Sequence, residues 1–392
     1  MSILLNSNIT TQLSSNVKEA MEPFYGEAID LKNLAKPNQK ALKAYSQAID
    51  KIYRSIEAKD EDSIILTSSA SEATSQVFMS MYLQYILTGR KNSIIISARA
   101  SIDELKLAQF LESQGCRVYR IPATVDGTID VELLKEYLNS KTALVSVPLV
   151  DEESGVIQPI EEISVACSMH DIPLYCNATH AIGKIPVSVQ RNAVAYLSFE
   201  GSTIHGPKDI GALYINEKAP ELMPLIYGTD SEQAGLRAMP KEVSSVIGFA
   251  TALENAIDAL DFDMEDVREL RDELEQGLLQ MNDSYSLAPW ALRVPNVCIM
   301  AFADVHASML LDRLAQKDIV AYSFATFSNK NFERVSLIDI ASLDSSLKHC
   351  VVGFSLNINN TEEEIKTTIE AVKEAVVQIR SEISGGICKE AK

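Results

Sequence analysis

Polar side chains that could do chemistry follow two short apolar runs near the middle of the chain. Asn177 and His180 come directly after the run Leu174–Cys176, and the loop Glu200–Lys208 follows the run Ala195–Phe199. Both runs have the character of buried strands. Because the carboxyl ends of neighbouring strands in an α/β sheet meet at one edge, this pattern predicts a site there.

Serines form a second candidate. Ser68, Ser69 and Ser71 lie between the apolar run Ser63–Thr67 and a segment of helical character that starts at Glu72. Hydroxyl groups at the start of a helix usually cap it. The free N–H groups at the same place can also hold a phosphate. Both interpretations stay open here, and capping is the commoner of the two.

Strands and helices alternate through the first part of the chain, which predicts parallel crossover units in one sheet. The expected strands are nearly continuous apolar runs, as in sheets covered on both faces. They are Ser63–Thr67, Ser93–Ser97, Cys116–Ile121, Ala143–Val147, Leu174–Cys176, Ala195–Phe199 and Gly211–Ile215.

The pattern changes after Ile215 to a smaller α+β arrangement. Strands are expected at Leu292–Ala301, Ile319–Tyr322 and Val351–Ile358, with a terminal helix at Thr361–Ile383. We therefore predict a large α/β domain over residues 12–255. Residues 1–11 with 256–384 would form a small α+β domain, and 385–392 a flexible tail.

Composition excludes several classes of protein. Of 392 residues 46% are hydrophobic, and the net charge is −19. A surplus of negative charge argues against nucleic-acid binding and against attachment to an anionic membrane. We see no apolar run long enough to span a bilayer and no signal peptide. Six scattered cysteines and five histidines without metal-ligand spacing predict a cytoplasmic protein with reduced thiols and no metal.

Several segments together resemble the NifS/IscS-type cysteine desulfurases. These belong to the class V aminotransferase group of fold-type I pyridoxal-phosphate (PLP) enzymes. The segments are LLNSNITTQLSSNVKEAMEPF, ESGVIQPIEEI, AIGKIPVSV, HGPKDIGALYI and NNTEEEI. The resemblance covers nearly the whole chain. It implies an α/β fold-type I PLP-transferase-like fold, in which helices cover a mostly parallel mixed sheet of the large lobe and a smaller α+β lobe follows.

The resembled family holds PLP on a lysine in a Ser-x-His-Lys-x-x-Gly-Pro-Lys loop. Here Ser202 and Thr203 stand at the His-Lys places, and Lys208 is retained only at the second lysine. A hydroxyl group cannot form an imine. Asn177 stands where the family has the aspartate of the pyridine nitrogen, and an amide supplies no charge there. His180 stands at the glutamine that contacts the ring oxygen.

Other family positions differ as well. The histidine that stacks on the ring is matched by Ser101, and the phosphate-binding serine by Glu200, whose charge would repel a phosphate. The sulfur-accepting cysteine falls at or beside Phe327, and the arginine for the substrate carboxylate at Gly353. The phosphate threonine from the neighbouring subunit falls at about Pro240. Of the phosphate cradle, Ala70 and Ser71 match best.

These departures predict a non-catalytic desulfurase-like protein, a pseudoenzyme with a scaffolding or regulatory role in sulfur transfer for iron–sulfur cluster assembly. We expect no catalytic residue and no cofactor, with PLP only as a non-covalent ligand. The residues that could then contact it are Ala70, Ser71, Asn177, His180, Ser202 and Thr203. The expected partners are a second copy or an active, lysine-bearing paralogue, with sulfur-acceptor or scaffold proteins.

Two alternatives stay open. One is an atypical PLP-binding desulfurase or aminotransferase-like enzyme that works without the lysine. The other is a small-molecule site in the vacated pocket that favours a cation. The side chains that would line it are Asp151, Glu152, His180, Glu200, Ser202 and His205.

Overall fold

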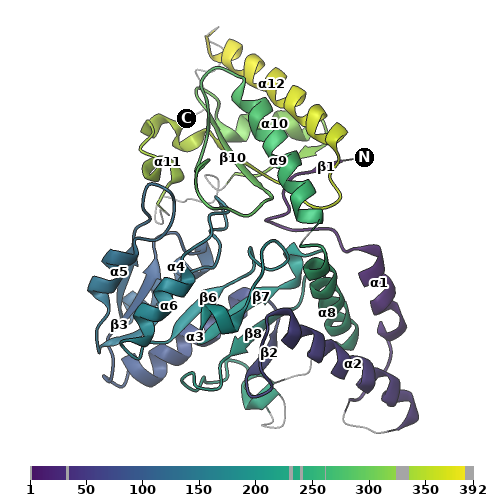
Figure 1. Ribbon diagram of the computed structural model, residues 1–392, viewed down its shortest axis with the longest axis vertical. Coiled ribbons are helices and arrows are strands. Elements are labelled where there is room, and N and C mark those ends of the chain that lie inside the picture. The colour runs from purple at the N-terminus through teal and green to yellow at the C-terminus, as the bar shows by residue number, and fades with distance from the viewer. Residues whose placement is uncertain are drawn as a thin grey trace.

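A computed structural model describes residues 2–31, 35–228, 233–238, 242–260, 262–323 and 335–384. Its larger part, the large lobe, is built on a seven-stranded sheet in the order β2-β8-β7-β6-β5-β3-β4 (Figure 1). Only β8 runs antiparallel to its neighbours. The strands are β2 Ser63–Thr67, β3 Ser93–Ser97, β4 Arg117–Ile121, β5 Thr142–Ser146, β6 Leu174–Asn177, β7 Tyr196–Glu200 and β8 Gly211–Ile215.

Alternate residues of these strands enter two separate cores, one on each face of the sheet. Ile94 and Ile96 of β3 join Phe78 in one core, and Ile95 joins Val145 in the other. Burial on both faces explains the continuous apolar runs of the sequence. The helices between the strands are α3 Ala70–Met81, α4 Ile102–Ser113, α5 Val131–Tyr137, α6 Ile160–Ser168 and the short α7 Val189–Asn192.

Helices from the start and the middle of the chain pack together at one end of the large lobe. In Figure 1, α1 and α2 lie beside α8, although α8 follows the whole sheet in the sequence. Apolar residues of α2, such as Ile52, share a core with Phe249 of α8. The bounds are α1 Ser15–Met21, α2 Lys36–Ser55 and α8 Val243–Asp258.

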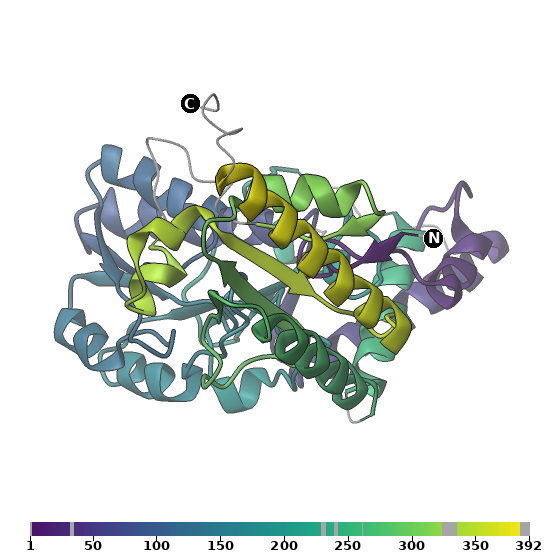
Figure 2. The same ribbon diagram turned by 90° about the horizontal axis from the view of Figure 1, so that it is seen from above.

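The smaller part, the small lobe, carries a three-stranded antiparallel sheet with β10 in the centre. Helices α9 and α12 lie side by side across it (Figure 2). The first strand of the chain, β1, pairs with β11, so the N-terminal residues also belong to this lobe. The elements are β1 Ile3–Leu4, α9 Asp263–Leu279, β9 Ser284–Ser286, β10 Val297–Phe302, α10 Ala307–Ala315, β11 Ile319–Val320, α11 Leu337–Ile340, β12 Val351–Ser355 and α12 Glu362–Ser384.

The sheet prediction is confirmed, and most strand bounds agree within one or two residues. The strand expected from Leu292 begins only at Val297, because Pro295 has no N–H group for a ladder. The domain boundaries stay a prediction, and the proposed tail 385–392 lies outside the described residues. In the described part of the chain, no single helix is long and apolar enough to cross a membrane. Within the same residues, α8 and α9 taken together, inclined by 72° to each other, meet that test by length and composition.

Candidate functional site

The candidate site lies where β6 and β7 end. Asn177 is the last residue of β6, and Glu200 is the last residue of β7. The turn Gly201–Thr203 (η3) follows and brings Thr203 back against the segment after β6. The predicted meeting of these two segments is therefore confirmed by their contacts.

Thr203 and Asn177 are both bonded to the same short segment. The Thr203 hydroxyl donates to the Thr179 carbonyl oxygen at 2.9 Å. The Asn177 amide oxygen accepts the Thr179 N–H group, also at 2.9 Å. Thr203 is buried, with 5% of its surface exposed. Both side chains thus stabilise the local backbone.

Lys184 is a buried amine beside the same turn. Its Nζ donates to the Thr203 carbonyl oxygen at 3.3 Å, and burial lowers its pKa to about 8. It lines a cavity of about 410 Å³ that Thr203 and His205 also line. Lys208, the retained lysine of the resembled loop, is exposed. In the sequence, Lys184 stands out only as part of the family-like segment AIGKIPVSV. Its burial arises from tertiary packing.

The start of α3 is occupied by carboxylates. Ser69 is the N-cap, since its hydroxyl accepts the Glu72 N–H group at 3.3 Å, so the capping interpretation is confirmed. The Ala70 N–H group donates to Glu200 Oε2 at 2.8 Å, and the Ser202 hydroxyl donates to Glu200 Oε1. The Ser71 hydroxyl turns to Asp103 of α4 instead.

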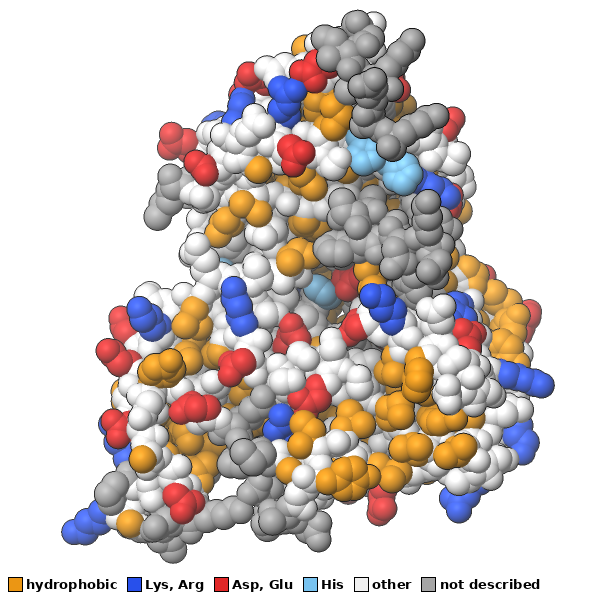
Figure 3. All heavy atoms as spheres, turned by 180° about the vertical axis from the view of Figure 1, so that it is seen from behind, with side chains coloured by type: hydrophobic (Ala, Val, Ile, Leu, Met, Phe, Trp, Pro, Cys, Tyr) orange, Lys and Arg blue, Asp and Glu red, His pale blue; other side chains and the backbone are white. Residues whose placement is uncertain are grey.

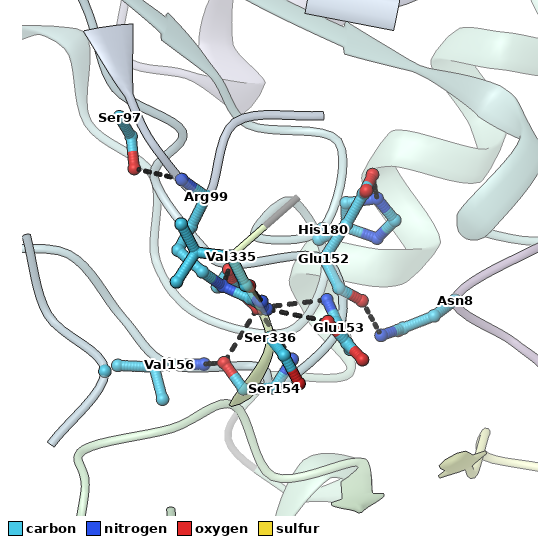
Figure 4. A network of polar contacts seen from close by, with 12 residues as sticks. Asn8, Ser97, Arg99, Glu152, Glu153, Ser154, Val156, His180, Val335 and Ser336 are labelled. Carbon is cyan, nitrogen blue, oxygen red and sulfur yellow. Dashed lines mark hydrogen bonds and ion pairs between the residues drawn. The ribbon is translucent and has the colours of Figure 1, made fainter. Parts of the chain in front are cut away.

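A buried ionic cluster forms around Arg99 (Figure 4). The Arg99 guanidinium donates to both oxygens of Asp151, at 2.9 and 3.0 Å, and to Glu153 at 2.8 Å. It also donates to the carbonyl oxygen of Val335 at 2.6 Å, so it joins the large lobe to the segment before α11. Burial alone would lower the pKa of Arg99, but the two carboxylates raise it.

His180 lies beside this cluster. Its Nε2 is 3.8 Å from a carboxylate oxygen of Glu152. The backbone carbonyl oxygen of Glu152 accepts a hydrogen bond from the side-chain amide of Asn8 (Figure 4). His205, the other histidine of the cation hypothesis, has its Nδ1 3.0 Å from the Gln12 carbonyl oxygen.

The side chains of the cation hypothesis do not converge on one point. His180 lies near Glu152, and Ser202 is bonded to Glu200. Asp151 is instead bonded to Arg99, and His205 faces the Gln12 carbonyl oxygen. Within the described ranges, no three His, Cys, Asp or Glu side chains are placed to hold a metal ion. Sequence reasoning missed Arg99, although an arginine within the apolar run IIISARA is an unusual signal. Phe327 and Pro240 lie outside the described residues.

Comparison with known proteins gives consistent matches. The family model for class V aminotransferases matches residues 3–368. The cysteine desulfurase IscS of Dictyoglomus turgidum is 29% identical over 387 residues, covering 97% of this chain and 95% of that protein. The cysteine desulfurase NifS of Azotobacter vinelandii is 28% identical over 390 residues, covering 97% and 94%. A solved structure of a NifS-like protein superposes with a TM-score of 0.88 at 25% identity, covering 96% of this chain and all of that chain.

These matches correct one expectation. Because the matched family consists of PLP-dependent enzymes, the prediction that the chain has no cofactor is wrong, and PLP is the cofactor that the family implies. A missing lysine removes a covalent bond, but it does not remove every contact that a ligand can make.

The described residues nevertheless do not fit PLP in the family's manner. Thr203 has no amine, the Ala70 N–H group already has an anionic partner in Glu200, and Asn177 carries no charge. One feature points the other way: the hydroxyl groups of Ser101 and Thr179 are buried and lack a hydrogen-bond partner within the part of the chain that the structure describes, so a ligand could satisfy them. Without an amine at position 203, these residues cannot carry out the family's imine chemistry. From the family model, the desulfurase relatives and the shared fold, it follows that the chain belongs to the class V aminotransferase family as a cysteine-desulfurase-like member.

Proposed function

We propose that this protein supports sulfur transfer for iron–sulfur cluster assembly without releasing sulfur from cysteine by itself. The single observation that carries the proposal is Thr203. It stands where the resembled family has its reactive lysine, and its hydroxyl is bonded to the Thr179 carbonyl oxygen. A hydroxyl group cannot take over imine chemistry from an amine.

Two further features support this proposal. The amide oxygen of Asn177 is bonded to the protein's own backbone. Arg99, Asp151 and Glu153 form a buried network among themselves and with the carbonyl oxygen of Val335, so these charges join segments of the fold. A chain that keeps the family's fold but bonds these polar groups to its own residues is suited to act through its surface, by binding other proteins.

The proposed role is that of a scaffolding or regulatory subunit in the cytoplasm. A dimer is the expected assembly, with a second copy or with a lysine-bearing paralogue, and sulfur acceptors or scaffold proteins as further partners. The proposed division into a large domain of residues 12–255 and a small domain of residues 1–11 with 256–384 would let either unit contribute a docking face.

The proposal is tested by sulfide release from cysteine in the presence of PLP. The chain alone should release no more sulfide than the Thr203→Ala variant, because neither has an amine at this position. A lysine-bearing relative mixed with the chain should show a changed rate of sulfide release. Release by the chain alone that Thr203→Ala abolishes would contradict the proposal, and so would an unchanged rate in the mixture.

A second candidate is an atypical PLP enzyme that works without a lysine. Family membership favours it, and so do the buried hydroxyl groups of Ser101 and Thr179, which a bound ligand would satisfy. Release of sulfide that survives Thr203→Ala but is lost with Asn177→Ala would favour this candidate over the first.

A further inference from the structure

The sheet carries Glu200 to the start of α3. Glu200 at the end of β7 pairs with Gly211 at the start of β8. A Cβ atom on Gly211 would lie 2.9 Å from the carbonyl oxygen of Phe199 and 3.0 Å from the carbonyl carbon of Ser69, and backbone atoms would have to shift to accommodate it. Only glycine permits this approach, so the edge between β7 and β8 lies directly against the backbone that leads into α3.

The Glu200 carboxylate binds there as an anion would. One oxygen accepts the Ala70 N–H group at 2.8 Å, and the other accepts the Ser202 hydroxyl. The first N–H groups of a helix have no partner within the helix, and the helix dipole favours negative charge beside them. Phosphate groups of ligands commonly bind at such a position. Glu200 supplies an equivalent negative group from the protein itself.

The neighbouring donors already have partners as well. The Glu72 carboxylate accepts the N–H group of Ser68 at 2.7 Å and its hydroxyl at 2.6 Å. Arg237 donates to the other Glu72 oxygen at 2.6 Å. Burial would raise the pKa of Glu72, but the bonds from Arg237 and Ser68 outweigh it and lower the pKa. A phosphate arriving here would meet two carboxylates and one guanidinium that is already paired.

We propose that Glu200 is an internal replacement for the phosphate group of a ligand. It fills the anion position at the start of α3, so phosphorylation of a pyridoxine-type ligand adds little to its affinity. Glu200 thereby determines how much the phosphate group of the implied cofactor contributes to its binding. The proposal takes this edge of the sheet as the ligand site and does not depend on the proposed function.

The test compares 4-deoxypyridoxine with its 5′-phosphate by fluorescence titration. Neither compound has an aldehyde, so neither can form an imine with any lysine. Glu200→Ser should tighten binding of the phosphate form about 30-fold, or about 2 kcal/mol, because the Ala70 N–H group becomes free for it. Binding of the unphosphorylated form should stay unchanged.

Two further variants make the result specific. Glu200→Gln keeps the shape but removes the charge, and should give a smaller gain in the same direction. Glu363→Ser removes an exposed carboxylate from the first turn of α12 and should leave both affinities unchanged.

Two results would overturn the proposal. One is a native chain that already prefers the phosphate form by about 30-fold. The other is a Glu200→Ser variant that shows no gain for it. Neither result bears on sulfide release, so this inference and the proposed function can fail separately.

Discussion

The side-chain amine of Lys184 lies in the protein interior. Among the described residues it makes one hydrogen bond, to the Thr203 carbonyl oxygen. Burial lowers its pKa from 10.5 to about 8. Below pH 8 the amine is protonated in both the folded and the unfolded chain, and the folded chain bears the cost of the buried charge. Between pH 8 and 10.5 only the unfolded chain holds the proton, so folding stability from this group rises with pH.

Replacing Lys184 with methionine should therefore stabilise the protein at pH 7 and lose this advantage by pH 10. The free energy of unfolding of the variant minus that of the native protein should fall by about 3 kcal/mol between pH 7 and pH 10. Urea unfolding at both pH values measures it, with the exposed Lys208→Met as the control. A difference that is the same at pH 7 and pH 10 would show that the amine titrates normally.

The residue types at the site could be read from the sequence, and their partners could not. A threonine at position 203 excludes an amine whatever its surroundings. The bond between Glu200 and the Ala70 N–H group joins residues that are 130 positions apart, so only the fold brings them together. The sequence suggested repulsion of a phosphate by Glu200, whereas the structure shows Glu200 bound where an anion would sit.

At the scale of elements, the Arg99 cluster connects three segments. Arg99 follows β3, Asp151 and Glu153 follow β5, and Val335 precedes α11. The side chains of Arg99 and Asp151 are 3% and 1% exposed. A buried arginine that faces two carboxylates is costly to remove, because it leaves negative charge without compensation.

Arg99→Met should lower the free energy of unfolding by about 3–5 kcal/mol. Glu153→Gln leaves the pair of Arg99 and Asp151 intact and should cost about 1 kcal/mol. Arg120→Met breaks the partly exposed pair with Glu112 and serves as the matched control, at a cost below about 1 kcal/mol. Urea unfolding followed by circular dichroism gives all three values. Losses for Arg99→Met as small as those for Arg120→Met would contradict the expected penalty for leaving Asp151 and Glu153 buried without a counter-charge.

Elements with a strong periodic pattern were predictable, and those set by tertiary contacts were not. Strands β2 and β8 have the bounds that their apolar runs predict. Strand β9 is only three residues long, and two of the three are serines, so it exists because it pairs with the edge of β10. Such a short strand has too little pattern of its own to be recognised in the sequence.

At the scale of the whole molecule, the two lobes meet at a narrowing of the outline, and hydrophobic side chains gather over the large lobe (Figure 3). The segment after β8 exposes three consecutive apolar residues. Leu225, Ile226 and Tyr227 are 38%, 39% and 73% exposed. Exposed apolar groups of this kind often mark an interface between proteins.

We therefore predict a dimer with a mass of about twice 43.1 kDa. Tyr227→Asp should shift the equilibrium towards the monomer, because a charge in an apolar interface is costly. Light scattering coupled to size-exclusion chromatography measures both masses, with the exposed Tyr25→Asp as the control. A native chain that stays monomeric at high concentration, alone and with a lysine-bearing relative, would contradict the dimer.

The most direct test of the central claim is the amount of alanine formed from cysteine per protomer when the chain is supplied with PLP. Release of sulfur from cysteine leaves alanine, so this amount counts turnovers independently of any sulfur acceptor. With Thr203 in place of an amine, the account predicts no alanine beyond that of a reaction without protein. Several equivalents of alanine per protomer, abolished by Asn177→Ala in an otherwise folded protein, would contradict it.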